Sequence, residues 1–146
     1  MRRHLCLVLL ALALGSAACH REAPEDAIPH VKLGMAPRDV RQRFQPGHEG
    51  RWQTALGAAD DTVLEWTARD PRAGVAAARF EFHLGMLVAI RARTSEATRA
   101  ESIATTARTV TVRAPEESGG TSITVLARDC PTHKEEADAL VAKAAR

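Results

Sequence analysis

The sequence predicts an α+β domain with two layers, in which a few short helices pack on an antiparallel β-sheet. Alternating apolar and polar residues recur in several short segments, a pattern typical of half-buried strands. Glycine and proline residues separate these segments at intervals that suit hairpins. The length of 146 residues matches one ordinary domain. Aromatic residues make up only 3% of the chain, so we expect its few Phe and Trp side chains to dominate the core.

The N-terminus carries the features of a bacterial lipoprotein signal. Arg2 and Arg3 form a basic start, and residues 5–14 form an apolar run that is too short to span a bilayer as a helix. Small residues at positions 16–18 then precede Cys19, as in a lipobox. We therefore expect acyl chains such as palmitate to anchor the protein to a membrane through Cys19.

This interpretation divides the chain into three parts. A lipoprotein signal peptide covers residues 1–18, a flexible tether covers residues 19–30, and a single α+β domain covers residues 31–146. The tether contains two prolines and several charged residues, a composition that does not favour a packed core. An ordinary secretion signal, cleaved after Ala18 without lipidation, is the alternative.

The mature chain is electrically balanced. The whole sequence has 20 Lys and Arg against 18 Asp and Glu, and loss of Arg2 and Arg3 with the signal peptide leaves 18 of each sign. Such a chain lacks the basic footprint that binding to nucleic acid requires. Cys130 is then a single thiol in an oxidising compartment, either buried or free to pair between molecules. A Cys19–Cys130 disulfide is conceivable if Cys19 carries no lipid.

The segment after Gly34 predicts a short helix around which the domain is organised. Pro37 suits the first helical position, where its missing N–H costs nothing. Met35 and Val40 then occupy the two positions of a hydrophobic staple. Phe44 shares the face of Val40 because four residues separate them. We expect the strands that follow to cover this apolar face.

Strands are expected in the middle of the chain at residues 51–54, 61–68, 76–83 and 86–93. Alternation within the second of these directs Leu64 and Trp66 toward the core.

The last two of these strands are expected to form a hairpin around Leu84-Gly85, where glycine offers the positive φ that such a turn needs. Phe80 and Phe82 share one face of the hairpin, and Leu84 extends it. On the partner strand, alternation predicts Val88 and Ile90 in the core.

The last third of the chain predicts a weak helix, a second hairpin and a final helix. The weak helix covers residues 95–107, although the threonines in its second half also suit a strand. The hairpin joins residues 108–113 to residues 121–128. Alternation predicts two facing pairs in this hairpin: Val110 and Val112 against Ile123 and Val125. Thr132 and Glu135 form a capping-box pattern at the start of the final helix.

A set of residues in the first two thirds carries a resemblance to a known family. The set comprises Leu33-Gly34-Met35, Pro37, Val40, Phe44, Trp66 and Phe80-x-Phe82-x-x-Gly85-x-Leu87-Val88. Over about residues 31–93 the chain resembles the SmpA/OmlA family, the small lipoprotein subunit of the outer-membrane β-barrel assembly machinery. The resemblance implies a short helix on an antiparallel sheet. It also implies a role in envelope assembly at the outer membrane, facing the periplasm.

Arg38, Arg41 and Arg43 are the candidate partner-binding residues, because they crowd one short helix of an otherwise balanced chain. Cys130 and His133 have a Cys-x-x-His spacing. Zinc requires four ligands and no second pair follows, so we expect no metal site. No nucleophile signature is present, and we expect neither a cofactor nor catalysis.

We therefore expect a non-catalytic lipoprotein of the bacterial cell envelope that binds or helps to assemble other envelope proteins. The alternative is a periplasmic module that binds a small ligand or inhibits another protein.

Overall fold

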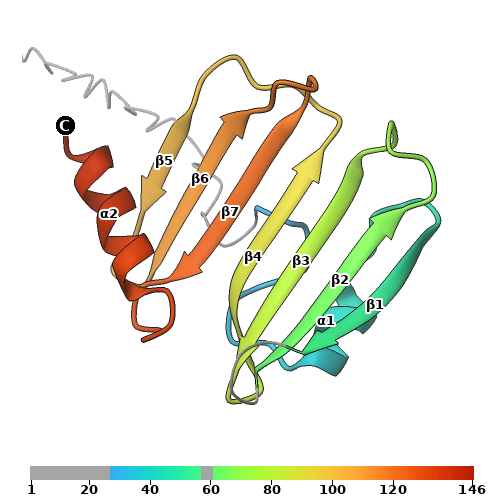
Figure 1. The fold of residues 1–146 in the computed structure, drawn as a ribbon, viewed down its shortest axis with the longest axis horizontal. Coiled ribbons are helices and arrows are strands. Elements are labelled where there is room, and N and C mark those ends of the chain that lie inside the picture. The colour runs from blue at the N-terminus through green and yellow to red at the C-terminus, as the bar shows by residue number, and fades with distance from the viewer. Residues whose placement is uncertain (1–26, 57–60) are drawn as a thin grey trace, which may run out of the picture.

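The computed structural model describes residues 27–56 and 61–146, and the signal peptide, Cys19 and most of the expected tether lie outside these ranges. The helices and strands follow the order α1 (Pro37–Arg43), β1 (Gly50–Leu56), β2 (Thr62–Ala68), β3 (Val75–His83), β4 (Met86–Thr94), β5 (Ser102–Thr105), β6 (Thr109–Pro115), β7 (Thr121–Ala127) and α2 (Lys134–Ala144). The strands form one seven-stranded antiparallel sheet in the order β1-β2-β3-β4-β7-β6-β5 (Figure 1). The predicted α+β class with an antiparallel sheet is confirmed.

The two helices lie on opposite faces of the sheet. Figure 1 shows α1 behind the strands at the β1 end and α2 in front of those at the β5 end. Adjacent residues of β4 point to the two sides: Ile90 packs in the core beneath α1, and Ala89 packs beneath α2. Each end of the sheet is therefore two layers deep, with its helix on a different face.

The core beneath α1 contains the large side chains. Leu64 and Trp66 point into it as predicted, together with Phe80 and Phe82. Val40 of α1 is also fully buried there. Pro37 is the first residue of α1, as expected, and Ala36 at the N-cap provides no side-chain hydrogen bond.

A β-bulge in the β3–β4 hairpin changes which residues of β4 face the core. Glu81 pairs with Ala89, whereas Phe82 pairs with Leu87, so Val88 is the extra residue. Leu87 is buried and Val88 is only half-buried, so the prediction of Val88 in the core is wrong, while Ile90 lies there as expected. The apolar run from Met86 to Ile90 hides the change, because a bulge within uniformly apolar residues leaves no break in the pattern.

The turn of this hairpin is the predicted Leu84-Gly85. Both residues have positive φ angles, 50° and 77°, as a type I′ turn requires. Leu84 does not extend the buried face of Phe82, because it is 81% exposed at the tip of the turn. That prediction is wrong because the turn ends the alternation of the strand.

Two predictions for residues 95–128 are wrong. Residues 95–101 are not helical, and the second half of the expected helix is the short strand β5, as its threonines allowed. In the β6–β7 hairpin, Val110 and Val112 pair with Leu126 and Thr124. Strand β7 carries apolar residues on both faces, Ile123 and Val125 on one and Leu126 on the other, so alternation alone could not fix the register.

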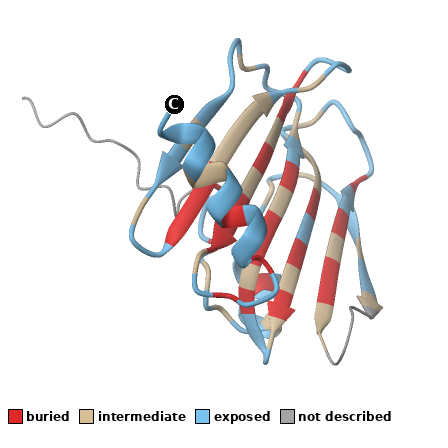
Figure 2. Ribbon diagram, turned by 60° about the vertical axis from the view of Figure 1, so that its left-hand side comes forward, coloured by how far each residue is buried: buried red, intermediate tan, exposed pale blue. Residues whose placement is uncertain are grey.

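Helix α2 begins one residue later than the capping box required. His133 occupies the N-cap position and makes no side-chain cap hydrogen bond, so Thr132 is not the cap. Ala137 is fully buried against the sheet, whereas Leu140 and Val141 are half-buried beside it. Figure 2 shows the rest of α2 largely exposed.

The ordered domain starts before residue 31. Ala27 and Ile28, which the sequence assigns to the tether, are buried in the core beneath α1. Gly34 N–H donates to Leu87 O, and Leu87 N–H donates to Met35 O, both at 2.8 Å. These bonds fix the segment before α1 to β4, and the burial of Ala27 and Ile28 shows that the domain includes at least residues 27–30.

Candidate functional site

The position of α1 is set by Phe44, which follows its last residue. The Phe44 ring makes edge-on contacts with Trp52, Trp66 and Phe80, with ring centres 5.2 to 5.5 Å apart. Edge-to-face contacts at this distance are a favourable geometry for aromatic pairs. The few aromatic side chains of this chain therefore hold α1 at the corner that it forms with β1 and β2.

The three predicted partner-binding arginines lie on α1, and all are exposed. The Arg41 guanidinium lies over the Trp52 ring, 5.3 Å from its centre, and donates a 2.8 Å hydrogen bond from Nη2 to Thr54 Oγ1. Arg38 and Arg43 make no hydrogen bond or ion pair with the residues that the structure describes. The structure thus brings one of the three onto β1 and leaves the other two available to a partner.

Strand β1 forms one end of the sheet, and in the described ranges no strand pairs with its outer edge. Its first residue is Gly50. A side chain does not fit at this position, because a Cβ atom there would come within 2.3 Å of the Trp66 ring. Trp52 is half-buried, between Phe44 on one side and Arg41 on the other. We call Arg38, Arg41, Arg43, Trp52 and Thr54 the arginine corner.

A chain of ion pairs crosses the opposite face of the sheet toward α2. Arg79 bonds Glu65 at 2.5 Å and Glu81 at 3.1 Å, and Arg91 bonds Glu81 at 3.3 Å. Arg91 then holds Glu136 of α2 through two hydrogen bonds of 3.0 and 2.7 Å. Charged residues at alternate positions of β3 and β4 were the sequence signal for this network, which sequence reasoning missed.

The bidentate pair of Arg91 and Glu136 changes the acidity of both groups. The hydrogen bond from Arg91 lowers the pKa of Glu136 below its ordinary value. The same bond to Glu136 raises the pKa of Arg91. Both groups therefore carry full charge at neutral pH, and their pairing fixes the start of α2 to β4.

Cys130 and His133, the Cys-x-x-His pair, are both buried. His133 Nε2 lies 3.3 Å from Glu81 Oε2, and its Nδ1 lies 3.9 Å from Glu136 Oε2. The thiol of Cys130 is free. Across the described ranges, no group of three or more His, Cys, Asp or Glu side chains is arranged to hold a metal ion. His133 instead lies beside Glu81 and Glu136, the two carboxylates that pair with Arg91.

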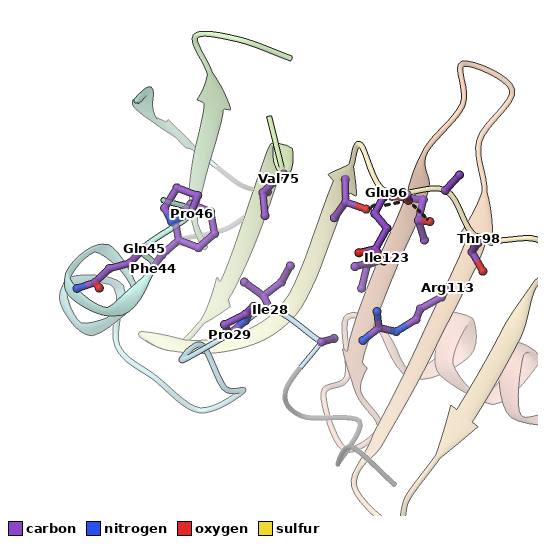
Figure 3. A pocket seen from close by; sticks show the side chains of 15 residues that line it. Ile28, Pro29, Phe44, Gln45, Pro46, Val75, Glu96, Thr98, Arg113 and Ile123 are labelled. Atoms are coloured by element: carbon purple, nitrogen blue, oxygen red, sulfur yellow. Dashed lines mark hydrogen bonds between the residues drawn. The ribbon is translucent and has the colours of Figure 1, made fainter. Parts of the chain in front are cut away.

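A cavity of about 580 Å³ lies on the α1 side of the sheet, between the first described residues and the segment after β4. Ile28 and Ile123 form part of its floor, and Arg113 extends into it from β6 (Figure 3). Glu96 lies at its rim, where its backbone oxygen accepts a 2.6 Å hydrogen bond from Thr121. The volume suits a small molecule, but the two isoleucines are already less than 4% exposed.

The predicted lipidation site, Cys19, lies outside the described residues. Within the ranges 27–56 and 61–146, no helix is both long and apolar enough to cross a membrane. Comparisons of the chain with protein-family models, with curated proteins and with solved structures find no match.

Proposed function

We propose that the protein is a non-catalytic lipoprotein of the bacterial cell envelope that binds another envelope protein at the arginine corner. The lipid on Cys19 anchors it, and the domain faces the periplasm from the outer membrane. One observation supports the binding surface above all: the Arg41 guanidinium lies over the Trp52 ring beside the outer edge of β1, with which no described strand pairs. The resemblance to the SmpA/OmlA family over residues 31–93 supports a role in envelope assembly.

The chemistry of the arginine corner indicates an acidic, extended partner segment. An open edge strand offers backbone N–H and C=O groups that a partner strand can pair with. Arg38 and Arg43, which have no described partner of their own, can each bind a carboxylate in a bidentate manner. Tryptophan and arginine are also the residues that most often dominate protein interfaces.

The same charges oppose pairing of two copies through β1. Edge-to-edge association would place the arginines of one copy near those of the other, and like charges across an interface cost free energy. The arginines therefore protect the edge from self-association while they leave it open to an acidic partner.

Reversal of the two available arginines tests the binding surface. The variant Arg38→Glu/Arg43→Glu keeps Arg41 on Trp52 and should fold normally, because exposed charges contribute little to stability. Arg99→Glu/Arg108→Glu, at exposed sites outside the corner, is the matched control. A photo-crosslinker at the exposed Gln53 of β1 should capture a partner in cells in the control and not in the reversed variant. Equal capture in both would contradict the proposal.

The anchor is tested separately. Cys19→Ser should abolish palmitate labelling and release the protein from the membrane fraction. Unchanged labelling or unchanged membrane retention would contradict the lipoprotein assignment, whatever the crosslinking shows.

The cavity beside Ile28 supports the alternative function, a module that binds a small ligand. Among the described residues that line it, Arg113 is the one Lys or Arg side chain, so we expect a ligand with an acidic group. Calorimetric titration with decanoate, compared between the unchanged chain and Arg113→Met, tests this alternative. Weaker binding to the variant supports it, and absence of binding to both excludes this ligand class.

A further inference from the structure

The two edges of the sheet differ in how they are protected. Strand β5 at one edge has 4 residues, whereas β1 at the other has 7 and pairs with β2 without a break in register (Figure 1). Natural edge strands are usually short, or carry a proline, a lysine or a bulge that prevents another strand from pairing with them. Strand β1, whose sequence is GRWQTAL, has none of these features. Its outer edge is therefore a template for an added strand.

The residue before β1 shows which backbone groups of the strand point outward. Glu49 O accepts a hydrogen bond from Arg69 N–H at 2.9 Å, and the β1–β2 register continues from this pair without a break. In an antiparallel pair, every second residue bonds to the residue opposite, and the residues between them direct N–H and C=O to the other side. Arg51 therefore bonds to β2, whereas Trp52 and Thr54 direct their backbone groups to the outer edge.

Strand β1 has an arginine on either face. Trp52 contacts Phe44, and Thr54 Oγ1 accepts the hydrogen bond from Arg41, so both side chains lie on the α1 side of the sheet. Successive side chains of a strand point to opposite faces, and Arg51 is accordingly exposed on the other face. In the part of the chain that the structure describes, the Arg51 side chain has no hydrogen-bond or ion-pair partner.

These positions determine what a strand added to β1 must carry. Residues directly opposite each other in paired strands lie on the same face. A residue opposite Thr54 would therefore lie beside Arg41, which uses Nη2 for Thr54 and has further N–H donors for a carboxylate. A residue opposite Arg51 would lie beside that guanidinium on the other face. Since positions 51 and 54 are three apart, the two carboxylates must also be three residues apart.

A second copy of β1 does not meet this requirement. The strand contains Arg51 and no Asp or Glu, so a second copy would bring another arginine to the edge and no carboxylate. Like charges across an interface cost free energy. The occupant is therefore an acidic segment of a different protein.

We propose that the partner adds to β1 as a further strand of the sheet, with two carboxylates three residues apart, one on each face. This inference rests on the proposed function, because it specifies the partner of the arginine corner. Backbone hydrogen bonds to Trp52 and Thr54 hold the added strand, and its carboxylates pair with Arg41 and Arg51.

A synthetic peptide of this pattern, acetyl-TTETVET-amide, is the probe. In antiparallel pairing with its valine opposite Trp52, it places its glutamates opposite Thr54 and Arg51. Amide hydrogen exchange of the full chain, purified as cells produce it, is followed by NMR. We expect the peptide to slow exchange at Trp52 and Thr54 several-fold and to change little at Arg51, whose N–H is already bonded to β2. No slowing at Trp52 and Thr54 would overturn the proposal.

A second peptide tests the spacing of the carboxylates. Acetyl-TETETVT-amide has the same composition and net charge, but its glutamates are two residues apart and lie on one face of an extended strand. It should bind several-fold more weakly than the first peptide. Equal binding of the two peptides would show that net charge alone attracts them, and the inferred pattern would be wrong.

Proline at position 54 tests the backbone hydrogen bonds. Thr54→Pro removes an outward N–H and no bond to β2, and edge strands tolerate proline at such positions. Thr54→Val is the matched control, because it removes the hydroxyl and keeps the N–H. The peptide should protect Trp52 in the valine variant and not in the proline variant, and equal protection in both would contradict strand addition. An N-methyl group on the peptide's valine blocks pairing without altering the protein, and it should also abolish the protection.

Crosslinking from Gln53 in cells separates this inference from the proposed function. Thr54→Pro should lose the captured partner, whereas Thr54→Val should keep it. If Thr54→Pro keeps the partner and Arg38→Glu/Arg43→Glu loses it, strand addition is wrong and the arginine corner remains the binding surface. Slower exchange at Trp52 when the chain alone is concentrated would identify a second copy as the occupant, and this result would also overturn the inference.

Discussion

The two helices of this protein are attached to the same sheet in different ways. Beneath α1, three other aromatic rings surround Phe44 within a large buried cluster. Beneath α2, the fully buried contacts are Ala137 on the helix and Ala89, Val110 and Leu126 on the strands. Ion pairs supplement this thin layer: Arg91 holds Glu136, and Lys143 holds Glu101 at 2.6 Å.

The difference shows that helix length does not decide how firmly a helix is held. Helix α1 has 7 residues and α2 has 11, and both are too short to be stable alone in water. Packing must therefore supply the stability of each. Aromatic burial supplies it for the shorter helix, whereas a small apolar contact and charged side chains supply it for the longer one.

The largest expected effect follows from removal of a ring beneath α1. Phe80→Ala should lower the free energy of unfolding by about 3–5 kcal/mol, because Phe80 is fully buried and contacts the rings of Phe44 and Trp52. Urea unfolding measures the loss. Thr67→Ala, on the exposed face of β2, is the control and should change stability by less than about 0.5 kcal/mol. A loss below about 1 kcal/mol for Phe80→Ala would show that this cluster does not dominate the fold.

A smaller effect is expected beneath α2. Leu126→Ala should cost about 2–3 kcal/mol, near the lower end for such changes, because α2 is lightly held and can move toward the vacated space. Amide hydrogen exchange should show α2 opening more readily, while α1 is unaffected. A loss as large as that of Phe80→Ala, with unchanged exchange in α2, would show that the two sides are equivalent.

The same comparison explains what sequence analysis could and could not predict. The side beneath α1 was predicted well, because Pro37, Val40 and Phe44 have helical spacing, and Leu64 and Trp66 alternate in a strand. Strong local signals and large side chains agreed there, and consistent signals specify a structure.

The α2 side of the sheet and the strands that lead to it were predicted poorly, for physical reasons. Strands β4 and β7 carry apolar residues on both faces, so alternation fixed neither the bulge at Val88 nor the β6–β7 register. The network from Glu65 to Glu136 joins residues far apart in sequence, and its geometry depends on that register. Within the candidate site, the sequence pointed to the three arginines, but the contact of Arg41 with Trp52 could be recognised only in the folded structure.

The smallest expected effect concerns acid. In the folded state the bond from Arg91 lowers the pKa of Glu136 below its ordinary value of 4.5. A carboxyl group whose pKa is lowered by folding stabilises the protein above its unfolded pKa, and this stabilisation is lost as the pH falls through the folded pKa. The side chain of Glu136 is 42% exposed, so solvent screening limits the contribution to about 1 kcal/mol or less.

Glu136→Gln should therefore destabilise the protein slightly at neutral pH and reduce the loss of stability on acidification. Urea midpoints measured from about pH 5 to about pH 3 should fall less steeply in the variant than in the unchanged chain. The exposed neighbour Glu135 makes no ion pair with the described residues, so Glu135→Gln should reproduce the unchanged profile. If the two variants behave alike, the Arg91–Glu136 pair contributes nothing to the attachment of α2, and its apolar contact alone must hold the helix on the sheet.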